Sequence, residues 1–267
     1  MRCLFPLTYD PVAKKLDAKS GIQVPCGKCF PCLRARSREW AFRSTHEQFS
    51  HVNSSFITLT YSDENLPKDS DTGMPCLVKD DYQRFFKRVR KAGHRFRYLA
   101  AGEYGPRTLR PHYHAVLYGL NFTAPALQKF WPYGFVSTRC LATSDLAGGY
   151  VASYTLKKSA DVVPVAENLR PFIAMSNGIG REFALKHART IMKRGYMYFH
   201  EFKIKIPRYY LKLFEFHYPD LFLDFLKQRD SNYSAAPTRE EQYASELADI
   251  AFKRFFAEKR KFFDDKY

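Results

Sequence analysis

The chain has 267 residues, of which 45% are hydrophobic, and a formal net charge of +16. That hydrophobic content is enough for a packed core and excludes a chain that is disordered throughout. A sequence pI near 9.6 favours a polyanionic partner, above all nucleic acid. An anionic membrane surface is a weaker candidate, because no basic segment carries a lipid-facing apolar stripe. With no transmembrane-length apolar run and no signal peptide, we expect a cytoplasmic protein.

The predicted elements start with residues 1–32, which are punctuated by Cys and Pro, and continue with a helix from Pro31 to about His51. Residues 54–61 (SSFITLTY) are rich in β-branched and aromatic side chains and predict a strand. Residues 62–79 carry turn formers and predict a loop. A helix then follows, capped by Asp80 or Asp81, whose apolar residues recur at helical spacing: Tyr82, Phe85, Phe86 and Val89.

Strands are next predicted at 97–101, 112–119 and 134–138, with helices at 124–131 and 143–158. The resulting order from residue 54 is strand, helix, strand, strand, helix, strand, helix. This order is typical of an α+β domain with a βαββαβ-like core on an antiparallel sheet. We therefore expect a core domain over 54–158, preceded by a Cys-rich segment and helix over 1–53.

Beyond the core, residues 177–180 (NGIG) indicate a turn that leads into a helical run to about Lys193. Thr238 to Glu241 matches a capping box, which predicts a helical tail with apolar residues at Tyr243, Leu247, Ile250 and Phe255. We expect an extension of the core over 159–230 and this helical tail over 231–267.

Two histidines and a glutamate form the first candidate site. His112 and His114 are two residues apart in a predicted strand, so both imidazoles point to the same face. Glu103 lies at the end of the preceding strand, which is an antiparallel neighbour if the turn between them is tight. Two imidazoles and one carboxylate suit Mn²⁺, Mg²⁺ or another divalent ion with open positions for a phosphate oxygen. An ordinary pair of strand histidines is the alternative.

Two tyrosines form the second candidate site. Tyr150 and Tyr154 are neighbours on one helix face, and Lys158 continues that face. A phenol is a weak nucleophile at neutral pH and needs a polarised phosphate and nearby positive charge to attack. Aromatic core packing is the alternative, although a core stripe rarely ends in two lysines.

Three ordered motifs resemble those of HUH-family replication initiators. They are Phe56–Thr60 (FITLT), Gly102–Gly105 (GEYG) with Pro111–His114 (PHYH), and Tyr150-x-x-x-Tyr154. Tyr113 departs modestly from the bulky hydrophobic residue usual between the two histidines. The string YVASYTLKK and the Cys-rich start are most similar to the initiators of the Microviridae, single-stranded DNA phages, and to their gokushovirus branch.

The resemblance implies a DNA-nicking enzyme for rolling-circle replication in the host cytoplasm. His112, His114 and Glu103 would hold Mg²⁺ or Mn²⁺ on the scissile phosphate of single-stranded origin DNA. Tyr150 or Tyr154 would attack, Lys158 would stabilise charge, and the second tyrosine would act when the circle is closed. No GxxxxGK[ST] loop is present in the sequence, so unwinding is expected from a host helicase and extension from a host polymerase.

Cysteines give a further candidate site. Cys26, Cys29 and Cys32, with Cys3 as a fourth ligand, fit a structural zinc site, whereas iron–sulfur ligation or reduced packing in a turn remain open. Three other readings of the whole chain are a transposase or relaxase, a non-catalytic zinc-containing DNA-binding protein, and a structural or packaging protein of a phage.

Overall fold

The computed structural model describes residues 3–16, 19, 21–105, 108–142, 147–153, 170–199 and 202–232. The chain forms two compact units. Unit 1 comprises Met1–Ala41 and Asn53–Ser176, and unit 2 comprises Phe42–Val52 and Asn177–Tyr267. Helix α1 (Phe30–Phe49) therefore contributes its first part to unit 1 and its last part to unit 2.

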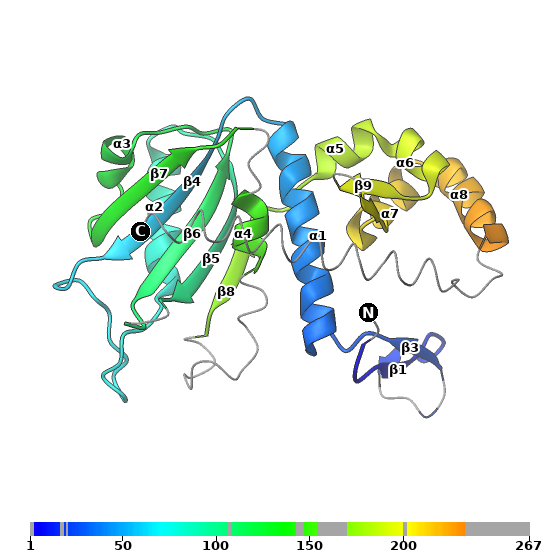
Figure 1. The fold of residues 1–267 in the computed structure, drawn as a ribbon, viewed down its shortest axis with the longest axis horizontal. Coiled ribbons are helices and arrows are strands. Elements are labelled where there is room, and N and C mark those ends of the chain that lie inside the picture. Colours follow the sequence, from blue (N-terminus) through cyan, green and yellow to red (C-terminus); the bar gives the residue numbers. More distant parts are fainter. Residues whose placement is uncertain are drawn as a thin grey trace. The chain divides into compact units, whose positions relative to one another are not determined.

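Unit 1 is built on a five-stranded antiparallel sheet with strand order β7-β4-β6-β5-β8 (Figure 1). Every neighbouring pair in this sheet is antiparallel, and β5 and β6 are the neighbouring pair that is also consecutive in the chain. The strands are β4 (Ser54–Tyr61), β5 (Arg97–Tyr104), β6 (Pro111–Tyr118), β7 (Gly134–Cys140) and β8 (Phe172–Met175).

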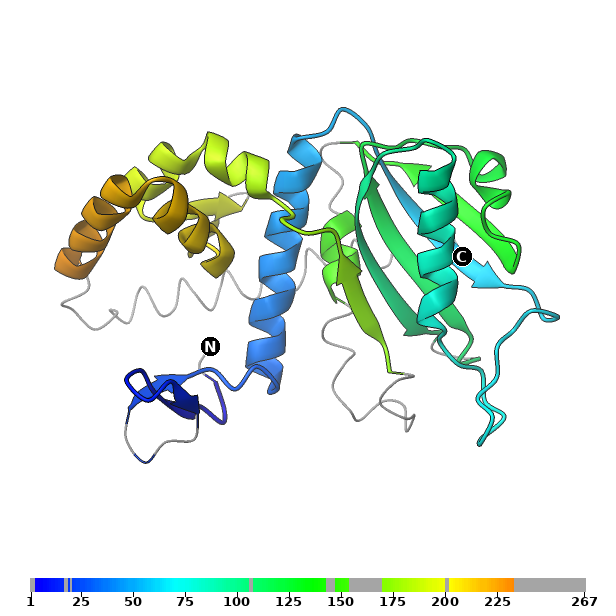
Figure 2. The same ribbon diagram turned by 180° about the vertical axis from the view of Figure 1, so that it is seen from behind.

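One face of this sheet packs on helix α2 (Lys79–Lys91), which lies across it in Figure 2. The helix buries its apolar stripe in an aromatic core that also includes Tyr113 and Trp131. Because side chains alternate along a strand, Tyr113 points into this core while its neighbours His112 and His114 point to the other face. The short helix α3 (Ala124–Gln128) adds Leu127 to the same core.

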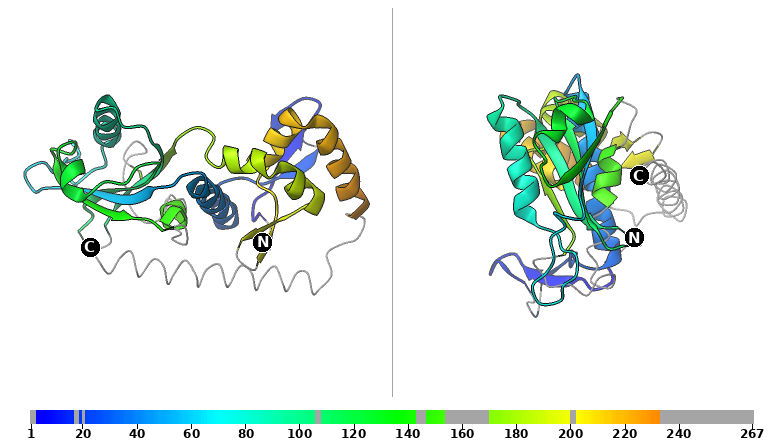
Figure 3. Two further views of the ribbon diagram at one scale, coloured as in Figure 1. Left: turned by 90° about the horizontal axis from the view of Figure 1, so that it is seen from above. Right: turned by 90° about the vertical axis from the view of Figure 1, so that its left-hand side faces the viewer.

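The opposite face of the sheet is covered by helix α4 (Ala147–Ser153), so that α2 and α4 lie on opposite sides of the strands (Figure 3, right). All residues of α4 from Ala147 to Ala152 are buried. The hydroxyl of Ser37 in α1 donates a hydrogen bond of 3.0 Å to the carbonyl of Ala152. This contact joins the first part of α1 to the end of α4.

The N-terminal segment forms a small antiparallel sheet of order β2-β1-β3. Its strands are β1 (Leu7–Asp10), β2 (Lys15–Leu16) and β3 (Ile22–Val24), and none of their residues is fully buried. A sheet without buried side chains gains little from the hydrophobic effect and needs another source of stability.

Unit 2 is a helical unit with one β-hairpin. Its elements after α1 are α5 (Arg181–Lys186), α6 (Ala188–Arg194), β9 (Met197–Phe199), β10 (Phe202–Ile204), α7 (Arg208–His217) and α8 (Pro219–Asn232). Their core includes Ile191, Tyr210 and Phe214. The last part of α1 is tied to the turn before α5, because Glu47 accepts a hydrogen bond from the backbone N–H of Gly180 at 2.6 Å.

The α+β class, the antiparallel sheet and the element order expected from residue 54 are confirmed. The strand predicted over 97–101 extends to Tyr104, and Glu103 lies near the end of β5 as expected. Helix α2 begins at Lys79 with Val78 at its N-cap, and the expected cap Asp81 instead accepts a hydrogen bond from Tyr61.

Other expectations need correction. The helical run expected from 181 to 193 is broken at His187 into two short helices. The helix predicted over 124–131 ends at Gln128. Strand β8 and the two small sheets were not predicted, because their short strands show too few alternations to be recognised. The capping box at 238–241 and most of the helix predicted over 143–158 lie outside the described residues. Among the helices that the structure describes, none combines the length and apolar character required to cross a membrane.

Candidate active site

Strand register brings the predicted histidines and glutamate to one face of the sheet. In the β5–β6 ladder, Glu103 is paired with His112 and Ala101 is paired with His114. On the other side of β6, His114 is paired with Thr58 of β4. Residues directly opposite each other in antiparallel strands project to the same face, so these side chains share one surface at the centre of the sheet.

His114 is the best fixed member of the set. Its Nε2 atom lies 3.0 Å from Glu103 Oε1, and its Nδ1 atom lies 3.0 Å from the hydroxyl of Thr58. His114 and Glu103 are 8% and 6% exposed, respectively. An imidazole held at both ring nitrogens has a fixed orientation, which is how ligating histidines are commonly positioned.

His112 is the more exposed histidine, and its ring centroid lies 6.3 Å from that of His114. The backbone of Gly105 comes close to this ring. A Cβ atom added at Gly105 would lie 3.0 Å from His112 Nε2. The glycine that follows Tyr104 in the GEYG motif therefore leaves room for the His112 ring.

Tyr150 joins this surface from α4. Its ring meets that of His114 edge-on, with centroids 5.7 Å apart, and it meets Phe56 in a similar geometry. Tyr150 is 4% exposed. Ala101 lies opposite His114 in the ladder, and its small side chain leaves room over β5 for the helix that carries Tyr150.

The structure thus brings together four of the predicted residues: Glu103, His112, His114 and Tyr150. The other two, Tyr154 and Lys158, lie outside the described residues. Two imidazoles and a carboxylate at the centre of one face are a donor set that divalent ions with oxygen and nitrogen preferences accept. The ring of Tyr150 lies beside them.

Comparisons with known proteins give the family. The family model of replication-associated proteins of the ORF2 type matches residues 54–159. The chain is 31% identical over 240 residues to the replication-associated protein ORF2 of Spiroplasma virus 4, which covers 77% of this chain and 72% of that protein. The chain belongs to this replication-associated family.

Two further relatives agree. The replication-associated protein VP4 of Bdellovibrio phage phiMH2K is 26% identical over 91% of this chain and 87% of its own length. The replication-associated protein ORF4 of Chlamydia phage 1 is 25% identical over 71% of this chain and 53% of its own. These phage relatives confirm the resemblance to the Microviridae initiators.

A crystal structure of the hypothetical protein ORF119 from Sulfolobus islandicus rod-shaped virus 1 is also similar. It covers 46% of this chain and 97% of that chain, with 17% identity and a TM-score of 0.31. This likeness is too slight to support an inference. In contrast, the family match runs from the start of β4 past the end of α4, and so contains every residue of the site above.

A second cluster of this replication-associated protein lies in its N-terminal segment. The sulfur atoms of Cys3, Cys26, Cys29 and Cys32 all lie within 4.8 Å of one another and can hold a metal ion. The sulfurs of Cys3 and Cys29 are 3.7 Å apart. The cysteines are free of disulfides.

Backbone N–H groups point at these sulfurs. Cys26 Sγ accepts hydrogen bonds from the backbone of Lys28 and Cys29, at 3.5 and 3.4 Å. These two donors, Cys29 first, lower the pKa of the Cys26 thiol. The turn that allows this contact passes through Gly27, whose φ of +74° favours glycine. A thiolate that accepts such bonds is prepared to bind a metal.

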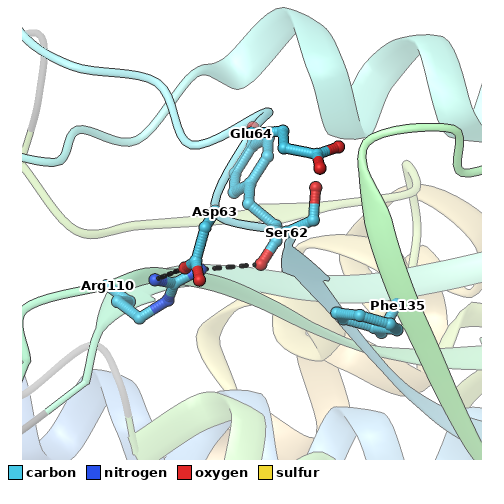
Figure 4. Close-up of a pocket in the computed structure, with 6 residues that line it drawn as sticks. Ser62, Asp63, Glu64, Arg110 and Phe135 are labelled. Carbon is cyan, nitrogen blue, oxygen red and sulfur yellow. Dashed lines mark hydrogen bonds and ion pairs between the residues drawn. The ribbon is translucent and has the colours of Figure 1, made fainter.

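An open pocket of about 400 Å³ lies at the end of β4 and is lined by Tyr61, Ser62, Asp63, Glu64, Arg110 and Phe135 (Figure 4). Arg110 pairs with Asp63 and donates a hydrogen bond of 2.9 Å to the carbonyl of Tyr61. Arg110 directly precedes β6, so these contacts fix the entry of the strand that carries the histidines. We assign the pocket a structural role because its cation is already paired.

Sequence reasoning missed Thr58 as a partner of His114. The signal was present in the pattern, because Phe56, Thr58 and Thr60 are each two residues apart and so lie on the same face of the predicted strand. The strand order needed to place it beside His114 was not readable from the sequence.

Proposed function

We propose that the chain is a replication-initiation endonuclease that nicks viral origin DNA through a 5′-phosphotyrosine link and rejoins the strands during rolling-circle replication of a single-stranded DNA phage. The observation that carries this proposal is the contact of His114 with Glu103 at 3.0 Å, with the Tyr150 ring edge-on to the same histidine. The family membership supports the role in replication.

His112, His114 and Glu103 would hold a divalent ion, Mg²⁺ or Mn²⁺. This ion would supply positive charge to a non-bridging oxygen of the scissile phosphate. Glu103 and His114 fit such a set, because they already meet at one point, and the Thr58 hydroxyl would accept the Nδ1 proton of a histidine that ligates through Nε2. His112 would have to move toward them to complete the set, since its ring centroid lies 6.3 Å from that of His114. Ala101 and Gly105 leave the space that these side chains need.

In the cleavage step, the phenol oxygen of Tyr150 or Tyr154 bonds to the phosphorus. The bond between phosphorus and the 3′-oxygen breaks, and that oxygen leaves as a 3′-hydroxyl after taking up a proton. Burial of Glu103 and His114 excludes water from the reacting groups, which strengthens electrostatic interactions there. Lys158 would stabilise the phenolate or the leaving oxygen.

The second tyrosine would act after one round of replication. It would cut the regenerated origin, and the freed 3′-hydroxyl would attack the first phosphotyrosine to close a circle. Each step exchanges one phosphodiester for another, so joining needs no nucleotide. We assign the chain to the host cytoplasm, with single-stranded origin DNA, a host helicase and a host polymerase as partners.

A labelled single-stranded oligonucleotide that spans the origin, incubated with protein and Mn²⁺ or Mg²⁺, tests the proposal on a denaturing gel. We expect a slowly migrating protein–DNA adduct that is lost with EDTA, with His112→Ala, and with Tyr150→Phe combined with Tyr154→Phe. The double tyrosine variant should still bind the strand. If no adduct forms on any strand of a cognate genome, the chain is better described as a non-catalytic zinc-containing DNA-binding protein.

The cysteine cluster would hold a structural zinc ion. Four sulfurs about 2.3 Å from zinc in a regular tetrahedron lie about 3.8 Å apart, and the sulfurs of Cys3 and Cys29 are 3.7 Å apart. The neighbouring sheet has no buried residue, so a metal that links Cys3 to the start of α1 would supply its missing stability.

Zinc analysis of protein purified without added metal tests this assignment. We expect about one zinc per chain, lost in Cys29→Ser together with Cys32→Ser, and unchanged in Cys140→Ser. The exposed Cys140 is a matched control because it lies outside the cluster. Folded protein without zinc or iron would exclude a metal at this site, and iron in place of zinc would change the assignment.

A further inference from the structure

The hairpin of unit 2 and the residue before it carry two tyrosines, the exposed Tyr198 and the half-buried Tyr196, in a strongly basic segment. Residues 188–212 contain seven lysines and arginines and a single carboxylate, Glu201. The hairpin consists of β9 and β10 (Figure 1). Tyr198 of β9 is paired with Lys203 of β10. Tyr198 is 52% exposed, whereas its neighbour Met197 is buried in the unit's core.

Successive side chains along β9 and β10 point to opposite faces of this hairpin. Met197 and Ile204, which are paired across it, pack on the helices of unit 2. Tyr198 and Lys203 consequently point to the outer face. Tyr196 lies just before β9 and joins them there.

Three contacts assemble these side chains into one surface. The amino group of Lys203 lies over the Tyr196 ring, 4.0 Å from its centroid. The rings of Tyr196 and Tyr198 meet edge-on with centroids 5.3 Å apart. Their hydroxyl groups are 3.4 Å apart. The Tyr196 hydroxyl raises the pKa of Tyr198, so the Tyr198 phenol is neutral at physiological pH.

The cations of this surface are available to an anion. Lys193, Arg194, Lys203 and Lys205 are all exposed, and within the described part of the chain no carboxylate forms an ion pair with them. Aromatic rings beside exposed cations that pair with no described carboxylate match a strand that offers both phosphates and unstacked bases.

We propose that this surface, defined by Tyr196, Tyr198 and Lys203 with Arg194 and Lys205, is a second binding site for single-stranded DNA, apart from the nicking chemistry of unit 1. The tyrosines stack on bases and the cations contact phosphates. A duplex is a poorer ligand, because its bases are already stacked on one another. The identification of the bound strand as phage DNA rests on the proposed function. The capacity of the surface to bind single-stranded DNA does not depend on that function.

Equilibrium binding measured without added Mg²⁺ or Mn²⁺ separates this site from cleavage. The probes are a thymidine oligonucleotide of about 15 nucleotides, near the site size of single-strand binders, and an abasic strand of equal length. We expect Tyr196→Ala with Tyr198→Ala to weaken binding of the thymidine oligonucleotide about tenfold, because its bases lose their stacking partners. Binding of the abasic strand should change little, because it has no bases to stack. Tyr196→Phe with Tyr198→Phe keeps the rings and should restore the affinity.

A matched control lies on α7, where Phe216 is 81% exposed and Lys212 is an exposed cation one turn before it. Phe216→Ala with Lys212→Ala removes a comparable aromatic and charged pair and should leave the preference for thymidine over the abasic strand unchanged. Lys203→Ala with Lys205→Ala should weaken both probes equally and reduce the salt slope by about 1.4.

If the double alanine variant binds both probes as the unchanged protein does, the proposed surface is wrong. If no adduct forms but the double alanine variant loses thymidine binding as expected, the nicking proposal is wrong and the hairpin site is supported. The reverse result would keep the nicking reaction and remove the hairpin site. The thermal unfolding of each variant should match that of the unchanged protein.

Discussion

At the scale of single residues, the site depends on partners that are not ligands themselves. His114 is held between Thr58 and Glu103, and the tautomer that ligates through Nε2 must carry its proton on Nδ1. With His114 ligating a metal through Nε2, the Thr58 hydroxyl would be the acceptor for that proton. It would therefore be a positioning residue in the proposed reaction, because it would act only through His114.

Replacing this acceptor gives a direct test. Thr58→Val keeps the shape of the side chain but removes the hydroxyl, so we expect weaker binding of the divalent ion by about 10- to 100-fold, as is usual for lost partners of ligands. Adduct formation titrated with Mn²⁺ measures this effect. Thr58→Ser should restore the unchanged Mn²⁺ dependence, and a valine variant with the same dependence as the unchanged protein would contradict the role.

Another buried histidine, His46 of α1, makes the stability of unit 2 depend on pH. Its ring stacks on Phe183 with centroids 4.0 Å apart, and Nδ1 lies 2.9 Å from the Tyr210 hydroxyl. Burial, with a smaller effect of His187, lowers the pKa of His46 to about 3. The His46 imidazole therefore stays neutral in the folded state at pH values where it is protonated in the unfolded chain, whose histidine pKa is about 6.5.

Between those two values protons favour the unfolded state, so unit 2 should lose stability as the pH falls. We expect a decrease of about 2 kcal/mol in its free energy of unfolding from about pH 7 to about pH 5. The free energy of unfolding is measured by equilibrating the protein in urea at each pH and then labelling it with a hydrogen-exchange pulse at one fixed pH. Peptides from unit 2 report the unfolded fraction of that unit. His46→Gln should remove this decrease, whereas an unaltered decrease would assign it to other groups.

At the scale of elements, β5 is the strand that organises the site. It provides Glu103 and Ala101 on one face, and on the other face Gly102 admits the ring of Phe172 from β8. A Cβ atom added at Gly102 would lie 2.6 Å from Phe172 Cε1 and 3.1 Å from Leu77 Cδ2. The glycine thus permits the close packing of β8 and the loop before α2 on this strand.

Gly102→Ala should destabilise unit 1 by about 1–3 kcal/mol, since it overpacks a filled core. Denaturation followed by the fluorescence of the buried Trp131 measures the loss. Phe172→Leu frees space at the same point, so the double variant should lose less than the sum of the two single losses. Additive losses would mean that Phe172 is not the obstacle.

At the scale of the whole molecule, we expect the net charge of +16 to dominate binding to DNA. Binding that releases counterions from about six or more phosphates should weaken at least about a hundredfold between about 50 and 200 mM salt. Fluorescence anisotropy with a single-stranded oligonucleotide in EDTA provides the measurement. An affinity that hardly changes over this range would show that the basic residues do not contact the strand.

Sequence alone determined the parts of this protein that depend on local patterns. Alternation placed His112 and His114 on one face and Tyr113 on the other, and the cysteine spacing singled out a cluster. The order of elements from residue 54 gave the α+β class, because strand and helix periods are strong over that region. The three motifs were sufficient for the family.

Only the tertiary structure decided which strands are neighbours. The contacts of His114 with Thr58 and Glu103 join residues 56 and 11 positions apart, and they exist because β6 lies between β4 and β5. The hairpin surface of unit 2 likewise required knowing that Met197 faces a core and Tyr198 does not. Strand order and burial arise from packing across the whole chain, which no local window of sequence contains.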